Sequence, residues 1–368
     1  MAITKIKVRD FTVFNDLTID IDAAVNIFIG ENGTGKTQLL KFIYAIVQVL
    51  MKQDIRLGSF FGAKSSSELI LFRRDADYPS ARFYFLHDGK EVSYLFNDAT
   101  VHPAGVSANV QDSRIVLEGP SGVYCGIQGE QYLTEWWEMF VYDGPLEQLE
   151  KMAKNIVFIP AKDMLTHAQG LPAMKANHGN HMPFDRTLID IINKASAWKL
   201  DKTPEIAYNI VPKLEKIMGG KIVIEKECFF IQKEDGEKIP FDIETEGVKK
   251  FGLLWQLLMN GSLTEGTILL WDEPEANINP KLIPVLAEII LELGRNGVQI
   301  FLATHDNFLA EYIEVLGLKS DKIAFHSLHK TDDGLKCETD EKFSMLEENS
   351  IINEKILLYQ KATEKVLG

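Results

Sequence analysis

The sequence predicts an α/β fold in which a mostly parallel sheet is covered by helices on both faces. Two observations carry this prediction. Residues 25–29 form an apolar run before a glycine-rich turn, and a helical pattern follows at residues 38–51. Residues 267–271 and 298–303 are two further apolar runs, separated by a helical pattern at residues 281–293. Short runs of this kind are typical of strands buried on both faces, as parallel sheets require.

The N-terminal part predicts an antiparallel β layer in addition to this sheet. Residues 4–8 and 17–21 alternate between polar and apolar side chains, which is typical of half-buried strands. Residues 81–96 predict a hairpin that turns at residues 87–90, and residues 113–128 predict a second strand pair. Residues 145–154 predict a helix, and a buried strand follows that stops at Pro160.

The rest of the chain predicts mainly helices. Residues 164–218 have a mostly helical pattern with a polar break near residues 178–181. Residues 221–233 predict a hairpin, and residues 246–259 predict another helix. A short strand is expected at residues 323–328 and a final helix from about residue 352. The sequence contains no internal repeat and no heptad run long enough for a coiled-coil arm.

The composition excludes several classes of protein. The 368 residues are 46% hydrophobic and 25% charged, which argues against a mainly disordered chain. The net charge of −14 argues against a surface built to bind nucleic acid everywhere. Cys125, Cys228 and Cys337 form no CxxC pair, so we expect neither a disulfide framework nor a Cys-rich zinc site. There is no membrane-length apolar run and no signal-peptide core, so we expect a cytoplasmic protein with no membrane partner.

Residues 30–37, GENGTGKT, match the phosphate-loop pattern G-x-x-x-x-G-K-[ST] between a predicted strand and a predicted helix. Glycines let successive backbone N–H groups face one anion, and the helix N-terminus adds partial positive charge. Lys36 is expected to reach the β and γ phosphates of ATP, and the Thr37 hydroxyl to bind Mg²⁺. The predicted nucleotide-binding residues of this loop are Gly30, Asn32, Gly33, Thr34, Gly35, Lys36, Thr37 and Gln38.

Acidic and basic side chains follow the two later apolar runs. Asp272 and Glu273 end the run at residues 267–271, and His305 follows the run at residues 298–303. Asp272 at a strand end beside a phosphate loop is expected to hold the Mg²⁺ water shell, and Glu273 to polarise the attacking water as general base. His305 can contact the γ-phosphate or that water. We therefore predict Glu273, His305 and Lys36 as the catalytic residues, and Thr37 and Asp272 as the metal ligands.

The segments GENGTGKT, LLWDEPEANINP and FLATHD together resemble the ABC-type ATPase heads of the SMC/RecF/OLD superfamily. More narrowly, they resemble stand-alone bacterial AAA-type proteins that include the ATPase subunits of phage-defence systems. Asn279 stands where that family has His, and Ile278 where it has Leu. The resemblance covers about residues 1–50 and 240–330. It implies a P-loop NTPase with a RecA-like core, an N-terminal antiparallel β layer and an inserted helical lobe.

The resemblance also implies a division of the chain and two further loops. One ABC-type ATPase domain would span residues 1–368. Its parts would be an N-terminal lobe (1–162), a helical lobe with the signature loop (163–262) and the C-terminal part of the core (263–368). Residues 244–250 resemble the signature form SEG-x-[KR]-[KR], in which Thr245 and Gly247 would bind the γ-phosphate held by another subunit. The glutamine of the family's Q-loop is absent, and Lys162 lies where it is expected.

The function implied by this resemblance is an ATP-driven switch that closes head to head with a second copy. It would control a separate effector, such as a nuclease or toxin, in anti-phage defence. The alternative is a RecF-like DNA-repair ATPase that clamps DNA directly, for which lysines 213, 216, 221, 249 and 250 could form a basic patch. A transporter ATPase subunit is disfavoured by the missing LSGGQ and Q-loop glutamine. A purely structural nucleotide is disfavoured by the presence of Glu273 and His305.

Overall fold

The structure is a computed structural model, and it describes residues 3–51, 57–62, 155–171 and 184–367 together with six strands between residues 80 and 142. The chain divides into two compact units. Unit 1 contains Met1–Asp22, Asn32–Lys154 and Leu328–Thr339, and unit 2 contains Ala23–Glu31, Asn155–Ser327 and Asp340–Gly368. Unit 1 therefore takes residues from the expected segments 1–162 and 263–368, and unit 2 takes residues from all three of 1–162, 163–262 and 263–368. The boundaries of these expected segments stay a prediction. The predicted helix at 145–154 and the polar break at 178–181 lie outside the described residues.

Unit 1 contains the predicted antiparallel layer, a sheet with the strand order β2-β1-β4-β5. Its strands are β1 (Ile3–Phe11), β2 (Phe14–Asp20), β4 (Ser80–His87) and β5 (Lys90–Asn97). All three pairings are antiparallel, and Ser80 to His87 pair with Asn97 to Lys90 as the sequence predicted. In β2 the apolar side chains are buried and the polar ones exposed, which explains why its alternation was visible in the sequence.

Unit 1 also holds a second antiparallel sheet and the helix that follows the phosphate loop. The sheet has the order β6-β7-β8-β9, with β6 (Ser107–Gln111), β7 (Arg114–Gly119), β8 (Gly122–Ile127) and β9 (Glu138–Tyr142). The pairing of β7 with β8 confirms the second predicted hairpin. Helix α1 (Lys36–Met51) starts directly after the glycine-rich turn, and the short helix η1 (Leu57–Phe60) follows it.

Unit 2 is built on the predicted parallel strands. These are β3 (Val25–Gly30), β10 (Ile156–Ile159), β14 (Ile268–Asp272) and β15 (Gln299–Ala303), and every residue in them is buried. β10 pairs with β14, β14 with β15 and β15 with β3, all in parallel. The sheet has the full strand order β10-β14-β15-β3-β16-β17. β16 (Ile323–Thr331) begins in unit 2, and the segment Leu328–Thr339 of unit 1 contains its end and most of β17 (Gly334–Asp340). The α/β fold class is thus confirmed.

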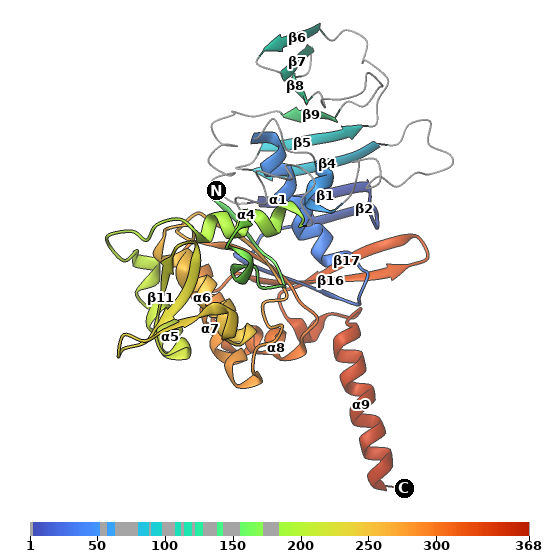
Figure 1. Ribbon diagram of the computed structural model, residues 1–368. Coiled ribbons are helices and arrows are strands. Elements are labelled where there is room, and N and C mark those ends of the chain that lie inside the picture. Colours follow the sequence, from blue (N-terminus) through green and yellow to red (C-terminus); the bar gives the residue numbers. More distant parts are fainter. Residues whose placement is uncertain are drawn as a thin grey trace. The chain divides into compact units, whose positions relative to one another are not determined.

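Helices of unit 2 pack with this sheet around one apolar core (Figure 1). They are α4 (Arg186–Ala195), α5 (Val211–Met218), α6 (Glu246–Met259), α7 (Ile283–Arg295) and α8 (Asn307–Leu316). Asp185 caps α4 by accepting from the amide of Thr187, and Asp306 caps α8 by accepting from the amide of Leu309. Short 3₁₀ helices are Leu165–His167, Glu205–Ala207, Phe241–Ile243, Pro280–Leu282 and Phe343–Met345.

The segment expected as a helical lobe also contains a three-stranded antiparallel sheet of order β11-β12-β13. β11 (Lys221–Glu225) and β12 (Cys228–Gln232) form the predicted hairpin, and β13 (Lys238–Pro240) was not predicted. A strand of three residues that ends in proline carries almost no pattern, and proline is tolerated because β13 lies at the edge of this sheet.

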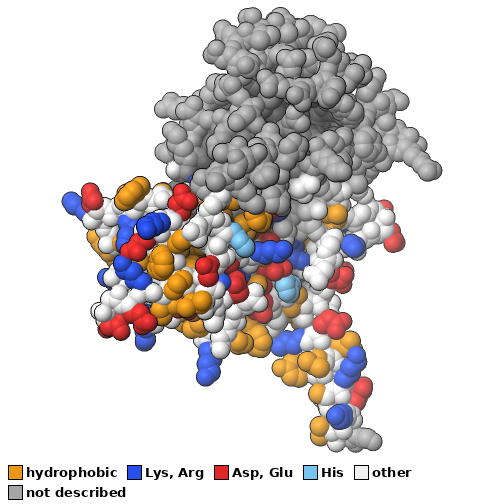
Figure 2. Space-filling view, viewed as in Figure 1, with side chains coloured by type: hydrophobic (Ala, Val, Ile, Leu, Met, Phe, Trp, Pro, Cys, Tyr) orange, Lys and Arg blue, Asp and Glu red, His pale blue; other side chains and the backbone are white. Residues whose placement is uncertain are grey.

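Helix α9 (Ser350–Leu367) extends away from α8, and most of its side chains are exposed (Figure 1). An ion pair between Lys355 Nζ and Glu311 Oε1, 2.5 Å long, joins it to α8. Ile356, Leu358 and Tyr359 are each at least 49% exposed, and Figure 2 shows apolar side chains among charged ones along this helix. The outer part of α9 therefore adds little to the core of unit 2. No helix within the described residues is long and apolar enough to cross a membrane.

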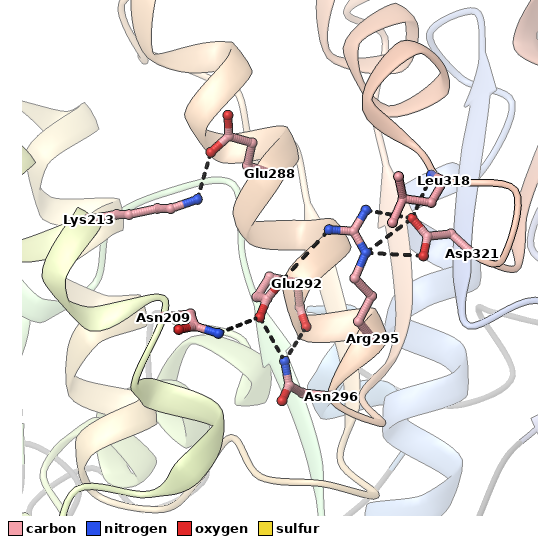
Figure 3. Close-up of polar contacts among 8 residues, drawn as sticks. All are labelled: Asn209, Lys213, Glu288, Glu292, Arg295, Asn296, Leu318 and Asp321. Carbon is pink, nitrogen blue, oxygen red and sulfur yellow. Dashed lines mark hydrogen bonds and ion pairs between the residues drawn. The ribbon is translucent and has the colours of Figure 1, made fainter.

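Polar contacts on both sides of α7 fix its position in unit 2 (Figure 3). At the C-terminal end of the helix, the Arg295 guanidinium donates to both carboxylate oxygens of Asp321, with Nη2 to Oδ2 at 2.7 Å and Nε to Oδ1 at 3.1 Å. On the side facing the α5 region, Lys213 pairs with Glu288 at 2.6 Å, and the Asn209 amide donates to Glu292 Oε1 at 3.1 Å. These contacts hold the helix that connects the two neighbouring strands β14 and β15.

Candidate active site

Three parallel strands of unit 2 end at the same edge of the sheet. Asp272 is in register with Ala303, and Ala303 is in register with Phe28. The residues that follow these strands therefore leave the sheet at one edge. They are Glu273 after β14, Thr304 and His305 after β15, and the phosphate loop, which starts at Gly30 where β3 ends. Open parallel sheets bind their ligands at such carboxyl edges.

Glu273 has a backbone conformation that non-glycine residues rarely adopt, with φ at +45°. Its amide donates to Ala303 O at 2.8 Å, and its carbonyl accepts from Lys250 Nζ at 2.7 Å and from the Ala276 amide at 3.1 Å. Its side chain carries Oε1 to 3.4 Å from His305 Nδ1. The Glu273 and His305 side chains are 36% and 53% exposed. The structure thus brings these two predicted catalytic residues together, with their polar atoms open to solvent.

Asp272 and Glu275 flank this turn and are both buried, at 7% and 8% exposure. Glu275 Oε1 accepts from the Thr304 hydroxyl at 2.7 Å, and the oxygen of that hydroxyl accepts from the Asp306 amide at 2.9 Å. Burial raises the pKa of Glu275, and the hydrogen bond from Thr304 opposes this shift. The hydrogen bond between Thr304 and Glu275 therefore joins the same two segments that the contact between Glu273 and His305 joins.

The phosphate loop has the backbone that anion binding requires. Gly33 and Gly35 have φ values of +80° and +83°, and the carbonyl of Gly35 accepts the Leu39 amide at 2.8 Å as α1 begins. A Cβ on Gly35 would lie 2.6 Å from Val13 Cγ2 and 2.7 Å from Phe14 Cζ, so only glycine fits there. The loop therefore meets both conditions of a phosphate cradle, a left-handed glycine pair and a helix N-terminus directly behind it.

The side chains of the phosphate loop differ in their exposure. Asn32 is exposed and Thr34 buried, while Lys36, Thr37 and Gln38 are half-buried. Gln38 Oε1 is buried and accepts no hydrogen bond within the described structure. No group of three or more His, Cys, Asp or Glu among the described residues could hold a metal. Mg²⁺ in nucleotide sites takes only one or two protein ligands and relies on substrate phosphates.

The predicted signature loop lies at the start of α6. Thr245 is the N-cap residue of this helix, and its side chain makes no capping hydrogen bond and is exposed. Gly247 is buried against the segment that follows Glu273, since a Cβ at Gly247 would lie 3.0 Å from Asn277 O and 3.3 Å from Ile278 Cα. The structure therefore brings the signature loop into contact with the turn that carries Glu273, and leaves the Thr245 hydroxyl open.

Two further predictions concern lysines, namely Lys162 in place of the Q-loop glutamine and a basic patch for DNA. Lys162 is exposed just beyond the carboxyl end of β10, at the same edge as Glu273, and its role stays a prediction. Of the five lysines considered for a DNA-binding patch, Lys216 and Lys221 are exposed and Lys249 and Lys250 are not. Lys249 and Lys250 are only 5% and 6% exposed, because both side chains turn toward acidic or carbonyl groups of unit 2, and Lys213 is paired with Glu288.

The contacts that hold this edge in shape are not predicted by the sequence. They involve Thr304, Glu275 and Lys250, of which the sequence predicts a role only for Lys250, in a surface patch. The sequence holds one signal for Glu275, because a carboxylate three residues after a buried strand needs a partner if it is buried as well. No sequence pattern pairs it with Thr304, since 29 residues separate them.

Parts of the chain match two family models and two curated relatives. An AAA ATPase domain model matches residues 1–99, and an AAA domain model, whose description also names an AbiEii toxin of a type IV toxin–antitoxin system, matches residues 167–311. The DNA replication and repair proteins RecF of Lactobacillus gasseri and Lactobacillus johnsonii are each 40% identical over 67 residues. This segment is 17% of the chain and only 18% of either relative.

Two solved structures share the fold over nearly the whole chain. One is an Smc head bound to the C-terminal winged-helix domain of ScpA, with a TM-score of 0.54 at 14% identity, covering 94% of this chain and 99% of that one. The other is an Smc head with an extended coiled coil, bound to the C-terminal domain of ScpA derived from Pyrococcus furiosus. Its TM-score is 0.51 at 12% identity, covering 98% of this chain and 99% of that one.

The chain therefore has the α/β fold of an SMC head, with a mostly parallel central sheet together with antiparallel strands and helices. The AAA family models and the RecF similarity agree with this, and together the comparisons support the SMC/RecF-like ATPase superfamily.

Proposed function

We propose that this chain is an ATP-hydrolysing switch in which Glu273 acts as the general base. The observation that carries the proposal is the shared sheet edge, where Glu273 and His305 lie 3.4 Å apart and the phosphate loop begins at Gly30. Lys36, the loop amides and the start of α1 would bind the phosphates of ATP. Thr37 and Asp272 would hold Mg²⁺, which neutralises phosphate charge when bound.

Hydrolysis at this edge would follow from the residues already described. A water molecule attacks the γ-phosphorus, the bond to the β–γ bridging oxygen breaks, and ADP leaves. Glu273 accepts the proton of the attacking water, and His305 donates to the γ-phosphate from beside it. The side chains of both residues are exposed enough to reach substrate, while the backbone of Glu273 is held on two sides.

The proposal includes closure of two copies around ATP. Thr245 supports it, because an N-cap hydroxyl that does not bond its own helix is open to accept a partner, and α6 adds the partial positive charge of its N-terminus. In a closed pair, each Thr245–Gly247 loop would bind the γ-phosphate held by the other copy. Closure is then a population shift toward the state that binds ATP more tightly.

Turnover of ATP by the purified chain tests the enzymatic part. Glu273→Gln is expected to bind ATP with unchanged affinity and to lose about 10²- to 10⁴-fold in kcat, since general-base catalysis contributes that much. Lys36→Ala is expected to lose ATP binding. Glu288→Gln, an exposed acid on α7, is the matched control and keeps wild-type turnover. Normal hydrolysis by Glu273→Gln would show that the base is another group.

A wider role is proposed on the resemblance to phage-defence ATPases. The closed pair would control a separate effector, a nuclease or a toxin. A phage plaque assay on cells with wild-type protein or Lys36→Ala tests this role, and equal protection by both proteins would contradict it.

The RecF-like alternative predicts DNA-stimulated hydrolysis with a steep salt dependence. The burial of Lys249 and Lys250 weakens this alternative, because neither side chain is open to DNA.

A further inference from the structure

Lys250 makes one specific contact with the backbone of Glu273. It lies in the second turn of α6, is only 6% exposed, and its Nζ donates to Glu273 O at 2.7 Å. A buried ammonium group needs a close partner, because its desolvation is otherwise costly. Burial lowers the pKa of Lys250 to about 8, while the charges of Glu275, Glu273 and Asp272 oppose this shift. Charged or neutral, the amine is held at the carbonyl of Glu273.

The backbone of Glu273 depends on such contacts. A residue other than glycine with φ near +45° is strained by about 1–2 kcal/mol, and it keeps this conformation only where its surroundings enforce it. The Glu273 amide is fixed to β15 through Ala303, and its carbonyl is fixed to α6 through Lys250. With both ends of the residue held, the direction of its Cα–Cβ bond is set, and this limits where the side chain can place the carboxylate.

The same helix carries the signature loop one turn earlier. Gly247 lies against Asn277 and Ile278, so the first turn of α6 is in close contact with the turn that follows Glu273. Lys249, the neighbour of Lys250, pairs with Glu246 of its own helix at 2.9 Å and does not reach that turn. Lys250 is therefore a side chain that links α6 to Glu273. A shift of α6 along the sheet edge, or away from it, would move the Lys250 amine and so change its contact with the Glu273 carbonyl.

We propose that Lys250 is a positioning residue, which places the Glu273 carboxylate for water activation and makes this placement depend on the position of the signature loop. The inference rests on the proposed ATPase function. A phosphate bound at Thr245 and Gly247 would fix α6, and α6 would fix Glu273 through Lys250. In a closed pair, an occupied signature loop would therefore help to hold Glu273 in the position that hydrolysis needs.

The test compares Lys250→Met with Lys233→Met in the full chain. Lys233 is the matched control, because its Nζ also donates to a main-chain carbonyl, that of Met218 at 2.6 Å, away from the sheet edge. Lys250→Met is expected to lose at least about 10-fold in kcat, since small misplacements of catalytic groups cost up to 10²-fold. Its Kd for ATP is expected to stay within twofold of wild type. Lys233→Met is expected to keep both values.

A second variant covers the case in which Lys250→Met does not fold. Lys250→Arg keeps a charged donor, and its branched guanidinium cannot occupy the same buried position, so we expect at least a threefold loss in kcat at unchanged ATP affinity. Wild-type kcat in either folded variant overturns the inference, and so does an equal loss of kcat in Lys233→Met. If the wild-type chain itself does not turn over ATP, the proposed function fails first, and the inference fails with it.

Discussion

The buried histidine next to the phosphate-loop strand gives a quantitative prediction of stability against pH. His326 in β16 is fully buried, stacks on Phe28 with ring centroids 4.7 Å apart, and places Nε2 3.2 Å from Asn26 Oδ1. The Asn26 amide group donates to Ala23 O and Ile300 O, so its oxygen is left to accept from the histidine. Burial lowers the pKa of His326 to about 4 from an ordinary value of 6.5.

The sign of the effect follows from this depressed pKa. Because the folded protein holds His326 neutral and the unfolded chain protonates it below about pH 6.5, the stabilisation is complete above pH 6.5 and is lost as the pH falls toward 4. With these two pKa values, the folded state loses about 2 kcal/mol between pH 7.5 and pH 5 from this residue alone. The carboxylates also make the free energy of unfolding depend on pH, but their contribution is the same in wild type and in a His326 variant.

The variant His326→Gln keeps a donor for Asn26 and removes the titration. Urea unfolding at pH 7.5 and at pH 5 gives the free energy of unfolding of both proteins. We expect wild type to lose about 2 kcal/mol more than the variant between these two pH values, whatever the absolute cost of the substitution. Parallel losses in the two proteins would refute the reasoning, because they would mean that the folded state protonates His326 as readily as the unfolded chain does.

Two further predictions concern the phosphate loop and α7. Gly35→Ala is expected to abolish ATP binding and to lower the free energy of unfolding by about 2–4 kcal/mol, from left-handed strain plus overpacking. Gly62→Ala has similar strain and no contact within 4 Å, so it should cost only about 1 kcal/mol and keep ATP binding; equal effects on binding would contradict the clash argument. Arg295→Ala is expected to cost about 1–2 kcal/mol in urea unfolding, because Asp321 loses a bidentate partner. Lys213→Ala removes an exposed pair and should cost less than about 0.5 kcal/mol, and a reversed order would contradict this ranking.

The parallel sheet was predictable because its strands are buried on both faces. All five residues of β14 are buried, so the apolar run at residues 267–271 had no polar interruption and could be recognised without any contact information. The phosphate loop was equally visible, since its glycines are required by local backbone geometry at Gly33 and Gly35. Strands buried on both faces and turns that need glycine can therefore be predicted from a single sequence, because both depend on neighbouring residues.

The parts of the site that were not predictable depend on contacts between distant segments. The left-handed backbone of Glu273 is enforced by Ala303 and Lys250, which lie 30 and 23 residues away. Lys250 was expected on the surface because lysine is usually exposed, and only the position of α6 turns it inward. The sequence therefore allowed the chemical groups of the site to be named, and the structure shows how their backbone is held.

The mass of the protein in solution tests the central claim of an ATP-closed pair most directly. Light scattering after size-exclusion chromatography would be run on wild type and Glu273→Gln, each with and without Mg-ATP. We expect Glu273→Gln with Mg-ATP to form a lasting assembly of at least two copies, while the same protein without nucleotide has the mass of one chain, 41.6 kDa. A single-chain mass for Glu273→Gln in saturating Mg-ATP would contradict closure around ATP and the trans role of Thr245 and Gly247.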